Sequence, residues 1–392
     1  MPKGARTSQI LHAYLPLLFL SVCAYALMYA PQPMFNAVSQ EFGIDRTTTG
    51  LTVSVFMLSL AISPLCVGLV LGKVGLKRSI VASLILIALS GVIIPLTTTF
   101  GQFLAIRFVQ GLLVPVLLTA LMTTIAKLFR HLDLSRALAG YIASNLFGTL
   151  LGRLACGVCA EHFGWRYTML GVCLIFLGGL FVIKFLPKES PETHPRHKIS
   201  EYCSVLGQKN LLPLILVEAC GIFVFAAMGN LIPFRMAELG QGQSESLVGF
   251  MYLGYSVGLI ASGVIGPLTR LLGTTRRFLI FASAFYFISF LGLTYPSVWV
   301  LFGSLWLVAG GQFLVHSRCP SLINQAGTKS GQCDRSLVNG LFLSIYYLGG
   351  VLGTLIPPTI YTYFGWFACY GLMQLVLLAA FLIILFKCKQ IG

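Results

Sequence analysis

Residues 68–78 read GLVLGKVGLKR and stand between two apolar runs, each long enough to cross a membrane. The stretch combines glycines, which permit tight turns and close backbone contact, with basic residues that favour the cytoplasmic side of a membrane. These residues are Gly68, Gly72, Lys73, Gly75, Lys77 and Arg78. The stretch therefore predicts a short cytoplasmic loop between two transmembrane helices.

Composition extends this prediction to the whole chain. Of 392 residues, 57% are hydrophobic and only 9% are charged, whereas an ordinary soluble domain has about 25% charged residues. The apolar runs have the length of spanning helices and lack the period-2 alternation of a membrane barrel. The sequence therefore predicts an all-α polytopic membrane protein.

Apolar runs predict about twelve spans, divided equally by one polar segment. The predicted spans are 13–35, 48–71, 79–98, 102–127, 137–160, 166–187, 211–236, 246–269, 278–295, 298–321, 336–360 and 367–386. The polar segment 188–210 contains Lys188, Glu189 and Pro191, a composition typical of a solvated linker. We therefore predict a six-helix bundle at 1–187, a cytoplasmic linker at 188–210 and a second six-helix bundle at 211–392.

The distribution of basic residues predicts the orientation. Of the 26 Lys and Arg residues, only Arg46, Arg166 and Arg235 fall in loops on one side, and only Arg107 and Arg153 fall well inside spans. All the others lie at the opposite side, which the positive-inside rule identifies as cytoplasmic. Both termini are therefore predicted to be cytoplasmic, and the net charge of +15 is read as topology, not as nucleic-acid binding.

The two halves repeat one another. Gly68, Gly75 and the Lys77–Arg78 pair are echoed about 200 residues later by Gly266, Gly273 and the Arg276–Arg277 pair. A second echo relates the Gly148/Gly152 pair and Phe-Gly-Trp at 163–165 to the Gly349/Gly353 pair and Phe-Gly-Trp at 364–366. Such duplication predicts two pseudo-symmetric bundles that face each other across a midplane cavity, as in many secondary transporters.

Three of these motifs resemble the major facilitator superfamily, and the resemblance covers essentially the whole chain. Residues 68–78 resemble its loop between helices two and three. The run Arg107-Phe-Val-Gln110-Gly111 resembles the fourth-helix motif of proton-coupled members. Residues 148–153, with Gly157 and the run 163–166, resemble the fifth helix of the bacterial acriflavine-sensitivity efflux branch. The resemblance implies a transporter of the drug:proton antiporter type.

The sequence departs from these motifs in two places. The family loop has an acid where this chain has Gly72, and the equivalent position of the second half is Arg270. That acid belongs to a charge network that latches the cytoplasmic side in the family, so a Gly72→Asp variant is expected to shift the protein toward an outward-facing state. The proline of the antiporter signature is also missing beside Gly148 and Gly152.

Glu218 is the one acid placed well inside a predicted span. A buried charge costs about 2.5–3.5 kcal/mol on insertion scales, so the carboxylate should face a cavity, pair with a base or be protonated. We predict a role in proton coupling together with Arg107 and Gln110, which share a helical face with Gly111. The alternatives are that Glu218 caps a shallow basic cluster, and that Arg107 is a structural hydrogen-bond post.

Polar and aromatic groups within the spans are candidates for the substrate cavity. They are Tyr29, Gln32, Asn145, Arg153, Asn230, Gln312, Asn339, Tyr346 and Tyr347. Each of them could equally be an interhelical hydrogen bond. Arg153 is also a candidate partner for Glu161, and His316 is interpreted as a topology determinant near a helix end. The glycine pairs 148/152 and 349/353 predict close helix packing and a surface on which the halves slide.

We therefore predict a secondary transporter that moves a small organic solute, with protons, by alternating access, and that exports it. Uptake by proton symport or uniport is an alternative, and a membrane-embedded sensor or enzyme is a weaker one. No phosphate-binding loop occurs in the sequence, and Cys156-x-x-Cys159 has no second cysteine pair or histidine pair at ligand spacing, so no cofactor and no metal are predicted. The expected location is a bacterial inner membrane, as a monomer in the lipid bilayer. The sequence does not name the solute.

Overall fold

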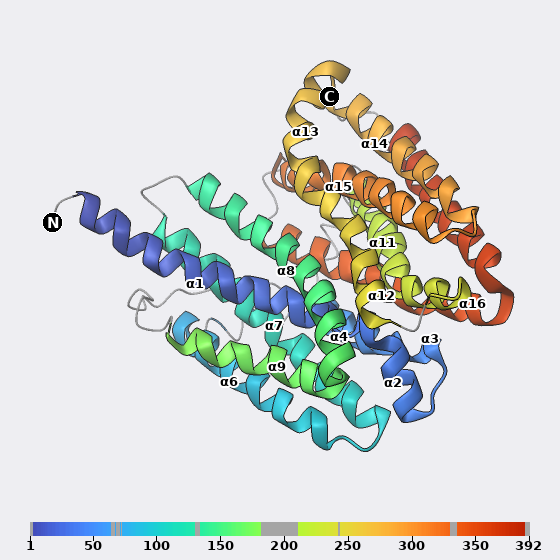
Figure 1. Cartoon of the computed structure of the whole chain (residues 1–392). Helices are drawn as coiled ribbons and strands as arrows, with labels where there is room; N and C mark the ends of the chain where they lie inside the picture. Colours follow the sequence, from blue (N-terminus) through green and yellow to red (C-terminus); the bar gives the residue numbers. More distant parts are fainter. Residues whose placement is uncertain are drawn as a thin grey trace.

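The structure, a computed structural model, describes residues 3–63, 67, 71, 73–129, 134–181, 211–241, 244–329 and 335–388. Every predicted span has a helical counterpart in it, so the all-α architecture is confirmed (Figure 1). The first half contains α1 (Lys3–Tyr29), η1 (Gln32–Met34), α2 (Phe35–Phe42), α3 (Arg46–Thr49), α4 (Leu51–Ile62), α6 (Leu76–Ile93), η2 (Ile94–Leu96), α7 (Phe100–Leu128), α8 (Leu134–Phe163) and α9 (Trp165–Gly178). The second contains α11 (Leu212–Glu238), α12 (Glu245–Met251), η4 (Tyr252–Ser256), α13 (Val257–Leu272), α14 (Thr275–Ser289), η5 (Phe290–Thr294), α15 (Val298–Lys329) and α16 (Arg335–Lys387).

Eight of the described helical segments are long and apolar enough to cross a membrane, and Thr47–Ile62 and Trp165–Phe181 are shorter apolar helices. One of the eight, Val338–Lys387, holds two predicted spans. Only Gly365, with φ of 75° and ψ of −176°, leaves helical geometry inside it. A residue with such a positive φ favours glycine, and here it folds one long apolar run into two antiparallel helices.

The sequence echo reappears in the backbone. Gly75 and Gly273 have φ of 87° and 80°, and Gly164 and Gly365 have φ of 79° and 75°. Gly75 and Gly164 directly precede α6 and α9, Gly365 precedes the second half of α16, and Gly273 lies between α13 and the N-cap of α14. Gly164 and Gly365 also have similar ψ values, 156° and −176°, whereas Gly75 and Gly273 differ, with ψ of 156° and −31°. The positive φ at all four positions supports an origin of the two halves by duplication.

The two glycine pairs make the same contact in each half. A methyl group on Gly152 of α8 would lie 2.5 Å from Cα of Ala26 in α1, and one on Gly353 of α16 would lie 2.0 Å from the carbonyl oxygen of Phe223 in α11. One turn earlier, Gly148 meets Val22 and Gly349 meets Ala219. These contacts lie within each half, so the predicted role as a sliding surface between the halves is wrong.

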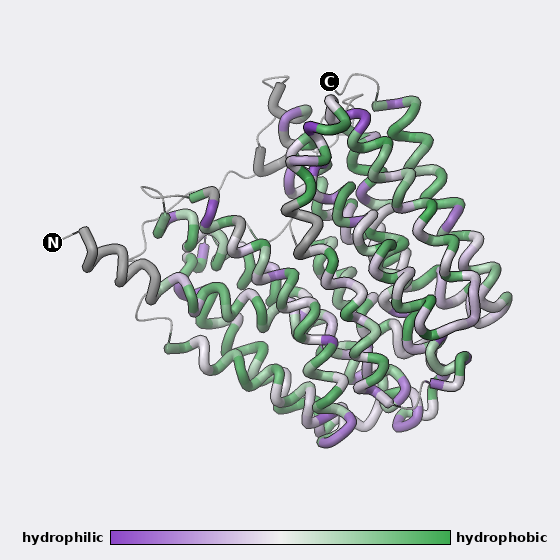
Figure 2. The backbone as a smooth tube through the Cα atoms, turned by 45° about the horizontal axis from the view of Figure 1, so that its top comes forward, coloured by the Kyte–Doolittle hydropathy of each residue, from purple (hydrophilic) through white to green (hydrophobic). Residues whose placement is uncertain are grey.

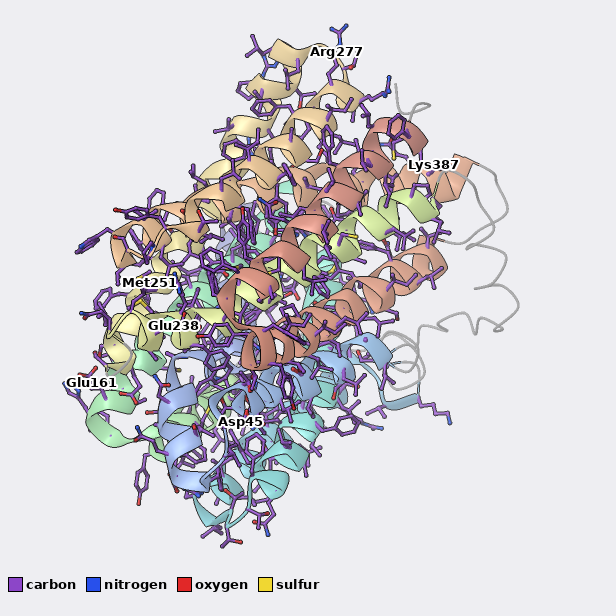
Figure 3. All side chains as sticks on the ribbon, turned by 90° about the vertical axis from the view of Figure 1, so that its right-hand side faces the viewer. Asp45, Glu161, Glu238, Met251, Arg277 and Lys387 are labelled. Carbon is purple, nitrogen blue, oxygen red and sulfur yellow. The ribbon has the colours of Figure 1, made fainter. Side chains whose placement is uncertain are left out.

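Charged residues distinguish the two ends of the molecule. Figure 3 shows Asp45, Glu161 and Glu238 toward one end, and Arg277 and Lys387 toward the other. We call the first end the sealed side. The second is called the terminal side, because both chain ends lie toward it (Figure 1). The polar segments at both ends enclose a predominantly hydrophobic middle (Figure 2), as expected of a protein that crosses a bilayer.

The halves, residues 3–181 and 211–388, join toward the sealed side and separate toward the terminal side. One buried apolar cluster contains residues of both halves. A second cluster lies entirely within the second half and includes Leu214, Phe278, Ile323, Phe342 and Ile384. In Figure 1, α1 and α8 diverge from α13 and α14 toward the terminal side. The helices of the two halves therefore lie farther apart toward the terminal side.

Several sequence predictions lie outside the described residues. They concern Gly68, Gly72 and the linker 188–210. Of the basic residues in the loop, Lys73 and Arg78 are exposed and Lys77 is half-buried. The weakened latch and the boundaries of the two bundles remain predictions.

Candidate functional site

Arg107 of α7 is fully buried and is held by backbone carbonyls. Its Nε donates to the Thr52 carbonyl at 3.2 Å, and its terminal nitrogens donate to the carbonyls of Leu27 and Met28 at 3.1 and 2.9 Å. A fourth hydrogen bond reaches Oε1 of Gln110 at 2.9 Å. Since these partners come from α1, α4 and α7, Arg107 ties three helices of the first half together.

Gln110 extends this network to two further helices. Its Nε2 donates to Ser90 Oγ of α6 at 2.9 Å and to Cys173 Sγ of α9 at 3.4 Å. On the same helical face, a methyl group on Gly111 would lie 2.7 Å from the Phe56 carbonyl oxygen, so α7 and α4 touch there. The described contacts of Arg107 and Gln110 thus lie within the first half, whereas Glu218 belongs to the second.

Glu218 lies on α11 with its side chain fully buried, and its partner is His316 of α15. The distance between Glu218 Oε2 and His316 Nδ1 is 2.7 Å. The His316 side chain remains 36% exposed, and its ring packs against Tyr346 at 5.3 Å between centroids. The interpretation of His316 as a topology determinant overlooked this contact, which no pattern along the sequence marks.

Two buried oxygens at the contact between α11 and α15 lack a hydrogen-bond partner among the described residues. They are Oε1 of Glu218 and Oε1 of Gln312. Gln312 lies one helical turn before His316 on α15, beside Gly221 of α11. A buried acceptor without a donor is costly, so a hydrogen-bond donor placed between α11 and α15 would stabilise these oxygens.

Arg153 of α8 lies where the two halves meet and is 1% exposed. Its guanidinium stands over the rings of Tyr29, Tyr252 and Tyr255, with 4.0, 4.9 and 5.1 Å from Cζ to the ring centroids. Tyr29 ends α1, whereas Tyr252 and Tyr255 belong to η4 of the other half. Its Nε donates to Gln32 Oε1 at 2.7 Å. We call these three rings the tyrosine cage.

The predicted pair between Arg153 and Glu161 is wrong. The Glu161 carboxylate instead accepts hydrogen bonds from Ser244 Oγ and Ser246 N, both at 3.0 Å. It therefore binds the N-terminal end of α12, across the interface between the halves. Arg153 lies two helical turns earlier on α8, where the tyrosine cage encloses it.

A chain of amides crosses the interface beside Arg153. Gln32 Nε2 donates to Asn230 Oδ1 at 2.9 Å, and Asn230 Nδ2 donates to the Gly50 carbonyl at 3.4 Å. Two of the predicted cavity residues, Gln32 and Asn230, thus join Arg153 in one network. This network connects α8, η1, α11 and the start of α4.

Backbone contact closes the sealed side next to Arg153. A methyl group on Gly157 of α8 would lie 2.6 Å from the Glu245 carbonyl oxygen, and one on Gly249 of α12 would lie 3.0 Å from the Arg153 carbonyl oxygen. Gly157 and Gly249 are therefore two of the small residues at which the halves meet. The fifth-helix motif contained Gly157, but its partner in the other half gave no signal.

Two acids at the sealed side have shifted pKa values. Burial raises the pKa of Asp45, but hydrogen bonds from Thr47 and Thr48 outweigh it, and the pKa is lowered overall. Burial raises the pKa of Glu245, and the nearby Glu161 carboxylate raises it further. Asp45 caps α3 through a bond from Thr48 N at 2.8 Å, so it is ionised in the structural role that it has here.

The remaining predicted cavity residues have mixed surroundings. Tyr346 and Tyr347 are half-buried, with ring centroids 5.4 Å apart, and the Tyr347 hydroxyl interacts with Tyr25 of α1. Asn145 is hydrogen-bonded to Ser21 within the first half, and Asn339 is half-buried. The sequence prediction missed Tyr25, Tyr252 and Tyr255. The spacing of Tyr252 and Tyr255 around Gly254 is the signal that could have found the last two.

The chain is similar to known membrane transporters over most of its length. Residues 17–330 match the Major Facilitator Superfamily. The chain is 25% identical over 383 residues to the inner membrane transport protein YnfM of Escherichia coli, covering 96% of this chain and 90% of YnfM. It is 24% identical over 169 residues to the chloramphenicol resistance protein CraA of Acinetobacter baumannii, covering 43% of this chain and 39% of CraA.

Solved structures share the fold. The nucleoside transporter NupG, crystallised as a point mutant, superposes with a TM-score of 0.78 at 12% identity, covering 96% of this chain and all of that one. A bacterial homologue of the human lysosomal transporter Spinster superposes with a TM-score of 0.74 at 14% identity, covering 97% of this chain and 95% of that one. At these identities the likeness establishes the fold alone.

Proposed function

This chain belongs to the Major Facilitator Superfamily, and from that premise we propose that it is a proton-coupled transporter that exports a small organic solute. Members of the family are secondary transporters and not enzymes, and the fold is that of a multi-pass membrane protein. The proposed location is a bacterial inner membrane with both termini in the cytoplasm. The positive-inside pattern supports that orientation.

The contact between Glu218 and His316 carries the proposal of proton coupling. Glu218 is fully buried, whereas His316 combines a 2.7 Å contact to its carboxylate with 36% exposure. The half-exposed imidazole takes a proton from the terminal side and transfers it from Nδ1 to Oε2 of Glu218. Both groups are then neutral, which removes the charge pair from the buried contact between α11 and α15.

Export is supported by the motif pattern on α7 and α8 and by the similarity to CraA, which is a chloramphenicol resistance protein. The missing acid at Gly72 and the missing proline beside Gly152 weaken the antiporter signature. Uptake by symport is therefore the competing direction. The two directions differ in whether the solute moves against or with an imposed proton gradient.

Reconstituted vesicles test the proposal. The full-length protein in proteoliposomes is supplied with a panel of small organic solutes, and movement of each solute is followed with and without an imposed pH gradient. We expect gradient-driven movement in the wild type and loss of the gradient dependence in Glu218→Gln, because the amide cannot bind the proton. His316→Gln should slow the gradient-driven movement of the solute, since it removes the imidazole that passes the proton to Glu218.

An exposed residue supplies the control. Arg277→Gln removes a cation at the terminal side and should leave gradient-driven movement unchanged. Normal gradient dependence in Glu218→Gln would remove Glu218 from the mechanism. Solute movement that ignores the pH gradient in the wild type would make the protein a uniporter.

A further inference from the structure

We propose that Arg153 is the binding site for an anionic group of the substrate, and that the transported solute is an organic anion with an aromatic or other flat apolar body. This inference rests on the proposed transport function and names its substrate class. Its basis is one juxtaposition: a buried guanidinium, with no acid of the described chain paired to it, enclosed by three tyrosine rings at the junction of the two halves.

The charge of Arg153 is not neutralised by any acid that the structure describes. The ion pairs among the described residues are Arg166–Glu41, Arg235–Glu238 and His316–Glu218. The acid closest along α8, Glu161, binds the start of α12 instead. A cation buried in a membrane protein without a counter-ion is costly and marks a functional site. An anionic ligand would supply the missing charge.

The guanidinium also has hydrogen-bonding capacity to spare. Arginine carries five N–H donors in a planar fork. The described hydrogen bonds of Arg153 use Nε, toward Gln32, and one terminal nitrogen, toward the Thr149 carbonyl at 3.2 Å. Arg107 differs, because four described hydrogen bonds tie it to carbonyls and to Gln110. The comparison assigns ligand binding to Arg153 and structural support to Arg107.

The cage presents ring faces and not hydroxyl groups to the guanidinium. Tyr252 donates its hydroxyl to the Gly229 carbonyl at 2.7 Å, and Tyr255 donates to the Phe225 carbonyl at 3.5 Å. Both hydroxyls are therefore anchored to α11, away from Arg153. Ring faces attract a cation through their quadrupole, but less strongly than a paired carboxylate would in a desolvated site. The tyrosine cage therefore encloses the guanidinium of Arg153 without neutralising its charge.

Exposure indicates which rings cover the site. Tyr29 and Tyr255 retain 8% and 5% exposure, whereas Tyr252 has none. A rotation of Tyr29 or Tyr255 would thus bring a ligand to Arg153. Tyr25, one turn before Tyr29 on α1, interacts with Tyr347 of α16, and Tyr346 lies between Tyr347 and His316. Aromatic side chains therefore extend from Arg153 toward the proton pair, and they favour a flat apolar ligand body.

A ligand series of constant shape tests the assignment. Binding of 2-naphthoate, 2-naphthamide and protonated 2-naphthylmethylamine to the purified full chain is measured calorimetrically at one neutral pH. We expect the carboxylate to bind about tenfold or more tightly than the amide or the amine, because only the carboxylate matches the guanidinium fork. This comparison uses the wild type, so it does not depend on whether a variant folds.

Variants locate the binding. Arg153→Gln should reduce naphthoate affinity about tenfold or more and leave naphthamide affinity unchanged. Arg153→Lys, which keeps the charge without the fork, should retain part of the preference for the carboxylate. The control Arg277→Gln, at the terminal side, should change neither affinity. Because these measurements impose no pH gradient, they are independent of the test of proton coupling.

Three outcomes overturn the proposal. In the folded wild type, they are an amine that binds as tightly as the carboxylate and the absence of any naphthoate binding. The third is naphthoate affinity that is unchanged in Arg153→Gln. A carboxylate preference that disappears with Arg153, while proton coupling also fails, would support an anion uniporter and reject only the proposed function.

Discussion

At the scale of single residues, the two intramembrane arginines have different roles because their neighbours differ. Backbone carbonyls of α1 and α4 surround Arg107, and aromatic faces of both halves surround Arg153. Carbonyls satisfy the donors of a guanidinium and hold it still, whereas ring faces leave its donors available. The same side chain thus serves as a support in one place and as a candidate ligand site in the other.

The support role predicts a large effect of Arg107→Lys on stability. Lysine cannot reach the carbonyls of Leu27, Met28 and Thr52 at once, and each buried carbonyl that loses its donor costs about 1–3 kcal/mol. The melting temperature of the purified variant should therefore fall clearly. Arg277→Lys, at an exposed position, is the matched control. An unchanged melting temperature of Arg107→Lys would refute the support role.

The sequence predicted which charged residues belong to the candidate site, but not which residues they contact. The cost of burying a charge singled out Glu218, Arg107 and Arg153 within apolar runs. The partners of Glu218 and Arg153 lie far away along the chain, at His316 and at Tyr252 and Tyr255. Which side chains meet between helices depends on the rotation of each helix about its axis, and apolar runs without a polar face do not fix that rotation.

At the scale of helices, glycine pairs set the spacing within each half. The pair Gly148/Gly152 brings α8 onto α1, and the pair Gly349/Gly353 brings α16 onto α11. Small residues let helix backbones touch in a bilayer, where apolar side chains gain little from association. Each half therefore contains the same backbone-to-backbone contact, repeated by the internal duplication.

Alanine at these positions should destabilise each half. The added methyl groups of Gly152→Ala and Gly353→Ala would meet backbone atoms of α1 and α11 at 2.5 and 2.0 Å, and overpacking of this kind costs about 1–3 kcal/mol. Gly371→Ala in α16 is the control, because no described atom lies within 4 Å of the added methyl. We expect lower melting temperatures for the first two variants only. Equal melting temperatures for all three would contradict the packing role.

Helix positions were predictable, because about 20 consecutive apolar residues are sufficient to define a span. Interruptions within the spans were harder to predict. The predicted span 246–269 is broken into α12, η4 and α13, and η4 supplies two rings of the tyrosine cage. No proline marks that break, so the segment read as one uniform helix.

At the scale of the whole molecule, the halves touch through polar and glycine contacts on the sealed side. Gly157 and Gly249 bring α8 and α12 together, and Gln32 and Asn230 join the halves beside them. These contacts must separate if the protein is to open toward the sealed side. Alternating access by movement of one repeat against the other requires such a breakable interface.

Bulk at this interface should favour opening of the sealed side. A side chain in Gly157→Val would meet the Glu245 carbonyl oxygen, which lies 2.6 Å from an added methyl group. Since Gly157 contacts the other half, the variant should hold the halves apart without unfolding either. Modification of a cysteine introduced at Tyr29 by a reagent added from the sealed side should accelerate. An unchanged rate in a folded Gly157→Val protein would contradict this account of the interface.

The most direct test of the central claim measures the separation of the halves as a function of pH. Spin labels at Lys73 and Arg277 report the terminal side, and labels at Tyr167 and Gln241 report the sealed side, all exposed positions. We predict that the two distances change in opposite directions between mildly acidic and mildly alkaline pH in the wild type. In Glu218→Gln the transition should vanish or shift by more than about one pH unit. Identical titration curves for the wild type and Glu218→Gln would contradict proton-coupled alternating access through Glu218.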